Sequence, residues 1–404
     1  MTPSGFKAGT LYSQFPNVSE SDFDVVRSSI GTRVNKDGLI EVMDANVPRL
    51  DYSDGGCPKL LTEDSSFIND IPLMKDWVKQ RVSTETYADL MGGQDAIKVT
   101  SLGGGTSSVY YNIGGINTTR TFSFYCKKGN SRFVTFADQY SIQFIVVADL
   151  DNLMLTSVGG SGVFGGIERF NDEWVRIQVT APISTTTAYV SVSPSDSLSA
   201  PQGNYCYVWG YQQESTSSLR ATSYFPTSGA NATRQADQVI NAGNSSTFNS
   251  QSGVLFVDVN YKDASSLCDI DISDGIGTNV LRIFKGSFSS IYGQLSDANG
   301  IVFNFIDISV SDLRLYNRIA LKYSVGDCSL YFNGVKVASD TSVTSISFSN
   351  PFSDLSLSKL GTQTFFGKTK SIQHYDYLTD SEMEKLTGYD SYSAMTSQFN
   401  FNIL

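Results

Sequence analysis

The strongest candidate for catalytic chemistry is a carboxylate pair in the run Asp269-Ile270-Asp271-Ile272-Ser273-Asp274. Side chains of an extended strand alternate between two faces, so Asp269 and Asp271 are expected on the same face. Two carboxyl groups placed across a glycosidic bond are the machinery of glycoside hydrolysis. The short reach of aspartate, however, would misplace a nucleophile and an acid. A solvated strand that ends in a Ser-Asp-Gly turn explains the run better, so we predict that the protein is not an enzyme.

Other nucleophilic side chains are sparse. His374 is the single histidine, and it lies in an expected strand without a nucleophile motif, so we predict a structural role for it. The cysteines are scattered singly without C-x-x-C spacing, which indicates free thiols and disfavours zinc. Cys126 and Cys206 lie in strand-like runs and are expected to be buried. The five cysteines are Cys57, Cys126, Cys206, Cys268 and Cys328.

Two loop carboxylates, Asp149 and Asp151, are of the kind that binds calcium. Calcium takes carboxylate and carbonyl oxygens, and sandwich domains often hold one such ion. No ligand spacing marks these residues. We therefore predict no metal and no cofactor, and the question of a structural calcium stays open.

Aromatic side chains are the candidate carbohydrate-binding residues. In the run Tyr205-Cys206-Tyr207-Val208-Trp209-Gly210-Tyr211, alternation predicts that the four large aromatic side chains share one sheet face. Such a row could stack on sugar rings, and so could Trp77. Burial in a core is the alternative, and burial statistics favour it. The candidates for carbohydrate binding are Trp77, Tyr205, Tyr207 and Tyr211.

The composition favours an all-β chain and argues against several functions. The 404 residues include 34 Gly, 21 Tyr and 25 Phe but only 10 Pro, which is typical of a β protein with many turns. A net charge of −11 without a Lys/Arg cluster argues against nucleic-acid binding. No apolar run reaches the roughly 18 residues of a membrane-spanning helix, and the first residues lack the features of a secretory signal.

Two long stretches predict one β-sandwich each. Residues 65–237 contain strand-like runs such as FVTFAD and AYVSVS between Gly, Asn and Ser turns, which favours a jelly-roll sandwich. In residues 238–390, Asn333-Gly334 between alternating apolar residues is a strong hairpin signal. Thr379 with Glu382 three residues later predicts a capping box at the start of one short helix.

The two ends of the chain differ from these stretches. Residues 1–64 include Gly31–Pro58, where turns at Gly38 and at Asp54-Gly55 separate short extended pieces. This segment has too few apolar residues to bury a core of its own. At the other end, the polar tail 391–404 is expected to fray or to pair with a neighbouring subunit.

The strings RVNKDGLIE and NVPRLDY, followed by Cys-Pro-x-Leu-Leu, resemble the N-terminal signature of bacteriophage virion proteins of the head-fibre and tail-fibre type. The strings FSFYCKKG, NDEWVR and WGYQQE make residues 65–237 similar to the carbohydrate-binding-module-like domains of those proteins. The strings NRIALKY and LYFNGVKVA make residues 238–390 resemble a concanavalin A-like or laminin-G-like sandwich.

This resemblance implies a non-enzymatic fibre or decoration subunit on the virion surface. Residues 1–64 would bind a capsid or tail protein, and the two lectin-like sandwiches would adhere to glycans. The chain would be made in the host cytoplasm without a signal peptide and would form a homo-oligomer, a trimer first and a dimer second. No nucleic acid or membrane partner is expected. The residues expected at the attachment surface are Arg33, Asn35, Asp37, Gly38, Arg49, Asp51 and Tyr52.

Several alternatives remain open beside this prediction. Arg33 and Arg49 are equally well explained as members of ion pairs within the chain. A tailspike-type glycan depolymerase would use Asp269 and Asp271, whose strand is similar to the Glu-x-Asp-x-x-Glu strand of sandwich glycosidases. A bacterial carbohydrate-binding surface protein would be expected to carry a signal peptide.

Overall fold

The computed structural model describes residues 5–7, 10–12, 23–215, 219–262, 268–286, 290–307, 312–358 and 364–388. Strands dominate these residues, together with the helix α1 (Asp380–Gly388) and the 3₁₀ helix η2 (Met74–Asp76). The predicted all-β fold is thereby confirmed. The predicted tail, 391–404, lies outside the described residues. Within the described part, no helix has the length and apolar character to cross a membrane.

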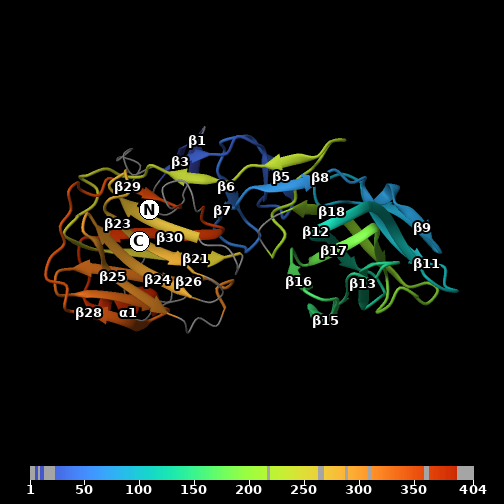
Figure 1. Ribbon diagram of the computed structural model, residues 1–404. Helices are drawn as coiled ribbons and strands as arrows, with labels where there is room; N and C mark the ends of the chain where they lie inside the picture. The colour runs from blue at the N-terminus through green and yellow to red at the C-terminus, as the bar shows by residue number, and fades with distance from the viewer. Residues whose placement is uncertain are drawn as a thin grey trace.

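Three long strands organise the first sandwich, at the right of Figure 1: β12 (Ser108–Lys128), β17 (Trp174–Ser193) and β18 (Tyr205–Ser215). The register of β12 against β17 shifts around Gly114, and such irregularities bend a strand. Alternate side chains such as Phe122 and Phe124 point into a buried apolar core. The other strands are β8 (Ser66–Asn69), β9 (Val78–Gln80), β10 (Val82–Tyr87), β11 (Ala96–Ser101), β13 (Phe133–Asp138), β14 (Ile145–Asp149), β15 (Met154–Gly159), β16 (Phe164–Arg169) and β19 (Ala232–Arg234).

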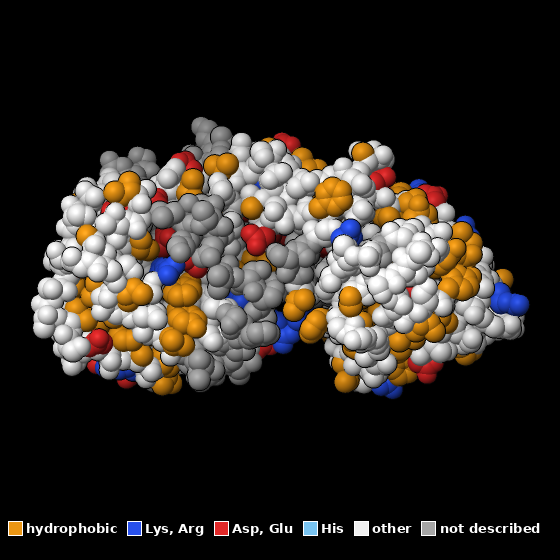
Figure 2. Space-filling view, in the orientation of Figure 1, with side chains coloured by type: hydrophobic (Ala, Val, Ile, Leu, Met, Phe, Trp, Pro, Cys, Tyr) orange, Lys and Arg blue, Asp and Glu red, His pale blue; other side chains and the backbone are white. Residues whose placement is uncertain are grey.

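The second sandwich, at the left of Figure 1, contains a seven-stranded and a five-stranded sheet whose inward side chains form one core. The seven-stranded sheet has the order β28 (Val335–Asp340), β27 (Cys328–Phe332), β26 (Asn317–Ser324), β21 (Ser252–Tyr261), β30 (Gly367–Tyr375), β7 (Lys59–Thr62), β6 (Arg49–Asp51). The five-stranded sheet has the order β25 (Gly300–Asp307), β24 (Ile291–Asp297), β23 (Val280–Lys285), β22 (Cys268–Ser273), β29 (Asp354–Ser356). In the space-filling view the two sandwiches form two lobes with an indentation between them (Figure 2).

Two local predictions for the second sandwich are confirmed. Strands β27 and β28 form a hairpin whose turn has φ values of 46° at Asn333 and 89° at Gly334. Thr379 and Glu382 form the capping box of α1, since the Thr379 backbone N–H donates to Glu382 at 2.8 Å and the Glu382 N–H donates to the Thr379 hydroxyl at 3.3 Å. The buried Met383 packs this helix against the seven-stranded sheet.

The N-terminal segment is built into the rest of the fold. Strands β4 (Gly31–Val34) and β5 (Ile40–Met43) form the expected hairpin, with Gly38 at φ 76° in its turn. Strand β7 pairs with β30, so β6 and β7 extend a sheet of the second sandwich. The remaining small sheet has the order β1 (Gly5–Lys7), β2 (Thr10–Tyr12), β3 (Phe23–Val26), β20 (Gln238–Ile240). Strand pairing crosses both predicted domain bounds, 64/65 and 237/238, because β3 pairs with β20 and β7 pairs with β30. The division of the chain into domains at these residues stays a prediction.

A buried ion-pair network connects this segment to the chain between the sandwiches. Arg49 Nη1 lies 2.8 Å from Glu63 Oε2, and its Nη2 pairs with Asp237. Arg27 Nη1 lies 2.7 Å from the same aspartate. Burial alone would raise the pKa of Glu63, but Lys262, Arg49 and Arg234 hold it well below its usual value. We call this network the arginine hub; it consists of Arg27, Arg49, Arg234, Glu63 and Asp237.

Candidate functional site

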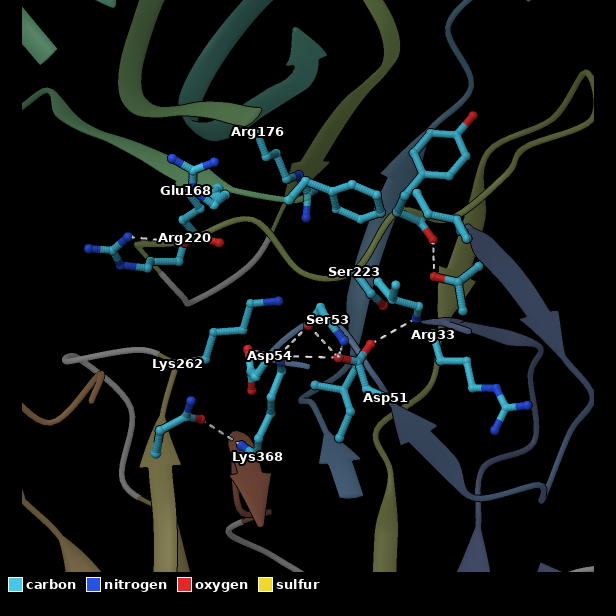
Figure 3. A pocket seen from close by; sticks show the side chains of 18 of the residues that line it. Arg33, Asp51, Ser53, Asp54, Glu168, Arg176, Arg220, Ser223, Lys262 and Lys368 are labelled. Atoms are coloured by element: carbon cyan, nitrogen blue, oxygen red, sulfur yellow. Dashed lines mark hydrogen bonds and ion pairs between the residues drawn. The ribbon is translucent and has the colours of Figure 1, made fainter. Parts of the chain in front are cut away.

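A cleft of about 500 Å³ lies between the two sandwiches. Its volume falls within the range of small-molecule sites, roughly 300–1,000 Å³. Figure 3 shows that its side chains come from the N-terminal segment and from both sandwiches. The charged and hydroxyl side chains that line it are Thr32, Arg33, Asp51, Ser53, Asp54, Tyr125, Glu168, Arg169, Arg176, Arg220, Ser223, Tyr224, Tyr261, Lys262, Arg314 and Lys368.

Asp51 and Lys368 form the side of the cleft contributed by the seven-stranded sheet. Asp51 accepts hydrogen bonds from the Val34 backbone N–H at 2.8 Å and from the Ser53 backbone N–H at 3.1 Å. Lys368 Nζ lies 3.1 Å from Asp51 Oδ1 and 2.9 Å from Asp54 Oδ1. Burial would raise the pKa of Asp51, but Lys368 and these hydrogen bonds lower it. Asp51 therefore stays ionised and acts as a fixed acceptor.

Arg176 is a buried cation of the cleft without an ion pair among the described residues. It lies on β17 and is only 6% exposed. Its guanidinium donates to the Thr222 carbonyl at 2.5 Å and to the Ser123 hydroxyl at 2.8 Å, and it lies 5.2 Å from the centre of the Tyr125 ring. Its Nε is buried without a hydrogen-bond partner among the described residues. None of the ion pairs within the described part of the chain includes Arg176.

Glu168 lies directly opposite Arg176 where β16 pairs with β17. Its carboxylate is taken by other partners: Arg220 Nη1 at 3.3 Å and the Gln178 side-chain amide at 3.0 Å. Burial would raise the pKa of Glu168, but Lys262, Arg220 and Arg176 together lower it. The group is therefore an anion and not a proton donor.

The cleft has an excess of positive charge. Of its lining residues within the described ranges, seven are Lys or Arg and three are Asp or Glu. Arg33 turns away from the cavity to pair with Glu41 at 3.0 Å (Figure 3). Arg169 is exposed and has no ion pair with any residue that the structure describes. Because the whole chain carries −11, this positive excess is a local property of the cleft.

Aromatic rings form the wall on the side of the first sandwich. The ring centres of Tyr125 and Phe170 are 5.1 Å apart, and those of Tyr125 and Tyr224 are 6.3 Å apart. Burial raises the pKa of Tyr125 to about 12, so its hydroxyl stays neutral. The cleft thus combines aromatic side chains with charged ones from both sandwiches. Sequence reasoning could not predict this combination, since these residues are far apart along the chain.

The predicted aromatic row is split between the two faces of its sheet. Tyr205 and Tyr207 are half-buried on the outer face, whereas Tyr211 is 9% exposed and packs in the inner core. The break lies at Gly210, which has φ 64° where the register of β12 and β18 shifts. A β-bulge inserts one residue and moves the following side chains to the opposite face. The prediction of a single face was therefore wrong for Tyr211.

The sugar-stacking candidates consequently differ in access. Trp77 is 2% exposed, packs on Tyr211 with ring centres 4.9 Å apart and donates its indole N–H to the Pro72 carbonyl, so it presents no ring face to a ligand. Tyr205 and Tyr207 form a surface cluster with Tyr87, whose ring centre lies 4.3 Å from that of Tyr207. Sequence reasoning missed Tyr87 because β10 reaches this face only through its pairing with β11.

Two of the predicted attachment residues are not accessible. Arg49 belongs to the arginine hub, and Asp51 is held by Val34, Ser53 and Lys368, so neither side chain is available to another protein. Arg33 is half-buried and pairs with Glu41. Ion pairs within the chain, the alternative considered above, therefore describe both arginines.

The other attachment candidates lie nearer the surface. Asn35 accepts hydrogen bonds from the backbone N–H groups of Asp37 and Leu39, both at 3.0 Å, and so shapes the β4–β5 turn. Gly38 provides the positive φ of that turn. Asp37 is exposed, and Tyr52 is half-buried at the end of β6. Their role in attachment stays a prediction.

The catalytic candidates occupy structural positions. Asp269 and Asp271 are fully buried on β22, and Asp269 lies 3.3 Å from Arg282. His374 lies 3.1 Å from the Tyr323 hydroxyl, and burial lowers its pKa to about 4. With this pKa the imidazole is neutral near pH 7. Its hydrogen-bond partner is the Tyr323 hydroxyl and not a serine or cysteine side chain.

The calcium candidates are also engaged. Asp149 Oδ2 lies 2.6 Å from Arg132, and Asp151 pairs with Lys128. Among the residues described, no group of three or more His, Cys, Asp or Glu side chains is arranged to hold a metal ion.

Comparison with known proteins adds structural similarities only. No family model matches the chain, and no curated protein matches it. The carbohydrate-binding module CBM40 of the Ruminococcus gnavus IT-sialidase is 18% identical, with a TM-score of 0.30 over 35% of this chain and 84% of that chain. The SAP-like pentraxin of Limulus polyphemus is 11% identical, with a TM-score of 0.29 over 34% of this chain and 70% of that one. Domains LG4-5 of the mouse laminin alpha1 chain are 10% identical, with a TM-score of 0.25 over 73% and 91%.

Proposed function

We propose that the protein is a non-enzymatic carbohydrate-binding protein whose cleft between the sandwiches receives the glycan. The observation that carries this proposal is the cleft, in which an aromatic wall faces charged and hydroxyl side chains across a volume of about 500 Å³. A sugar ring has apolar C–H faces and a rim of hydroxyl groups, so it uses both kinds of surface. Pockets with a few convergent polar groups on an apolar wall are typical of ligand sites.

The acidic groups of the cleft favour binding over hydrolysis. Glycoside hydrolysis uses one carboxylic acid whose pKa is raised so that it can protonate the leaving group. The pKa values of Asp51 and Glu168 are both lowered, and each carboxylate is already engaged by neighbouring donors. Neither is therefore suited to the role of general acid.

We place this binding function on a virion surface, in a fibre or decoration subunit attached to a capsid or tail protein. Support comes from the strings RVNKDGLIE and NVPRLDY in the N-terminal segment. The exposed turn of the β4–β5 hairpin, with Lys36 and Asp37, is the accessible part of the expected attachment surface. Several copies in a homo-oligomer, for which a trimer is our first expectation, would turn weak single sites into firm adhesion.

A steric block of the cleft tests the proposal. Ser53 lies in the centre of the lining, between Asp51 and Lys368 (Figure 3), so Ser53→Phe fills part of the cavity without changing its charge. We expect Ser53→Phe to weaken binding on a glycan array at least about tenfold, because the ring displaces the ligand. Cys57→Phe is the matched control, since Cys57 is exposed on the same β6–β7 connection and does not line the cleft.

Two results would overturn the proposal. The first is an array of neutral and acidic glycans on which the folded wild-type protein binds nothing. The second is glycan hydrolysis by the wild type that disappears in Asp271→Asn, which would favour the depolymerase alternative. Thermal unfolding of each variant shows whether a loss of binding reflects a loss of fold.

A further inference from the structure

We infer that the cleft selects saccharides that carry a carboxylate, and that Arg176 is the side chain that binds this group. The inference rests on the proposed function in one respect, because it takes the ligand to be a glycan. It goes further in assigning a ligand class and a specificity-determining residue.

The first argument is the incomplete neutralisation of Arg176. A guanidinium has five N–H donors, and here it makes two hydrogen bonds, both to neutral oxygens, with residues of the described structure. A buried cation without a hydrogen-bonded counter-ion is destabilising, because burial removes water that neutral acceptors replace only in part. An anionic ligand in the cleft supplies the missing charge.

The second argument is that the acid opposite Arg176 in register has other hydrogen-bond partners. Glu168 lies opposite it in register, yet Arg220 and Gln178 bind its carboxylate. Lys262, whose side chain also lines the cavity in Figure 3, pairs with the buried Glu63 at 3.0 Å. Glu168 and Lys262 are thus paired with other residues, and Arg176 is a buried cation of the cleft without an ion pair among the described residues.

The third argument concerns the kind of anion. The planar fork of a guanidinium matches the two oxygens of a carboxylate. Phosphate sites commonly use the N-terminus of a helix, and no helix among the described residues lines this cleft. Phe170 is half-buried, lines the cleft and packs on Tyr125 beside Arg176, so it can receive the apolar face of the sugar that carries the carboxylate. Uronic acids and nonulosonic acids share this chemistry.

Calorimetric titration of the full chain at low salt tests the inference with matched ligands. The probes are trigalacturonate and N-acetylneuraminic acid, each compared with its own methyl ester, which keeps the sugar and removes the charge. We expect at least one acid to bind about tenfold or more tightly than its ester, since a charged hydrogen bond is lost on esterification. The acid that binds identifies the sugar class.

Variants assign the effect to Arg176. Arg176→Gln should weaken binding of the acid about tenfold or more and binding of the ester much less, because the ester has only a neutral oxygen to offer the guanidinium. The preference for the acid over its ester should therefore largely disappear in this variant. Arg169→Gln, at the exposed edge of the cleft, should weaken binding of the acid only about two- to fivefold. Because Arg169 is exposed, this variant should fold normally, so it still tests the preference for an anion if Arg176→Gln lowers the thermal midpoint.

The outcomes separate the two proposals. Equal affinity for acid and ester contradicts the carboxylate inference and leaves carbohydrate binding in place. Acid binding that is unchanged in Arg176→Gln contradicts the role of this residue. Acetate that binds as tightly as the sugar acids contradicts saccharide selection, and the absence of binding by every sugar contradicts the proposed function itself.

Discussion

Arg49 is a buried member of the arginine hub and not part of an accessible attachment surface. It lies in the string NVPRLDY, which resembles an attachment motif, yet its side chain is fully buried between Glu63 and Asp237. Sequence proximity does not reveal this, because Asp237 lies 188 residues away. A buried ion pair that loses one partner typically destabilises a fold by about 3–5 kcal/mol. Such a motif can therefore be a requirement for folding and need not mark a surface contact.

His374 predicts a specific pH dependence of stability. Its pKa falls from 6.5 to about 4 in the folded protein because the ring is buried. Below pH 6.5 the unfolded chain takes up a proton that the folded chain refuses until about pH 4, so the free energy of unfolding should decrease as the pH falls through this window. The full shift corresponds to about 3 kcal/mol. Urea denaturation between pH 7 and 4.5 measures the slope.

His374→Gln is the control for this prediction, because it removes the titrating group from a single position. Its unfolding free energy should be nearly constant between pH 6.5 and 5.5, because the carboxylates of the unfolded chain, with pKa values of about 4, take up few protons in this range. A slope identical to that of the wild type would show that another group is responsible.

Among the elements, the bulge at Gly210 in β18 changes which side chains face the core. Without it, strict alternation would place Tyr211 beside Tyr207 on the outer face. With it, Tyr211 packs against Trp77 and Phe136, and Trp209 packs with Tyr125 beside the cleft. The bulge at this glycine thus moves Tyr211 into the core, while Trp209 stays on the face of Tyr207.

Gly210→Ala should destabilise the first sandwich. Gly210 has φ 64°, and a Cβ there would lie 3.0 Å from the Tyr125 ring, so both backbone strain and crowding oppose the substitution. We expect a loss of about 1–3 kcal/mol in urea denaturation. Gly229→Ala separates the two causes, because Gly229 also has positive φ, at 85°, but has no atom within 4 Å of the added methyl group. Equal losses in the two variants would exclude crowding at Tyr125.

The features that could be predicted from the sequence are those that depend on residues close together along the chain. The Gly38 turn, the Asn333-Gly334 hairpin and the Thr379 capping box each depend on neighbouring residues, and all three are confirmed. The cleft could not be predicted, because it brings together β17, the β6–β7 connection and β30. Strand pairing at such separations depends on the whole core, which no local pattern encodes.

For the whole molecule, the structure predicts that the second sandwich is incomplete without the N-terminal segment. Residues 238–390 alone lack β6 and β7, so the edge of β30 and core positions around Leu60 would be uncovered. We expect this fragment to aggregate or to unfold without cooperativity, whereas residues 23–390 should unfold cooperatively in urea. Size-exclusion chromatography and denaturation measure both. A monomeric 238–390 fragment with a sharp transition would show that β6 and β7 are dispensable.

The pairing of β7 with β30 also sets the order in which the protein can form during synthesis. Ser53 and Lys368, which meet beside this pair, are separated by 315 residues. Residues 49–62 leave the ribosome early but have no sheet to join until residues 367–375 have been made. Closing so large a loop is slow, and an unpaired strand exposed meanwhile is prone to wrong contacts. The strands of the first sandwich lie between these two segments in the sequence. This sandwich can therefore fold before residues 49–62 pair with residues 367–375.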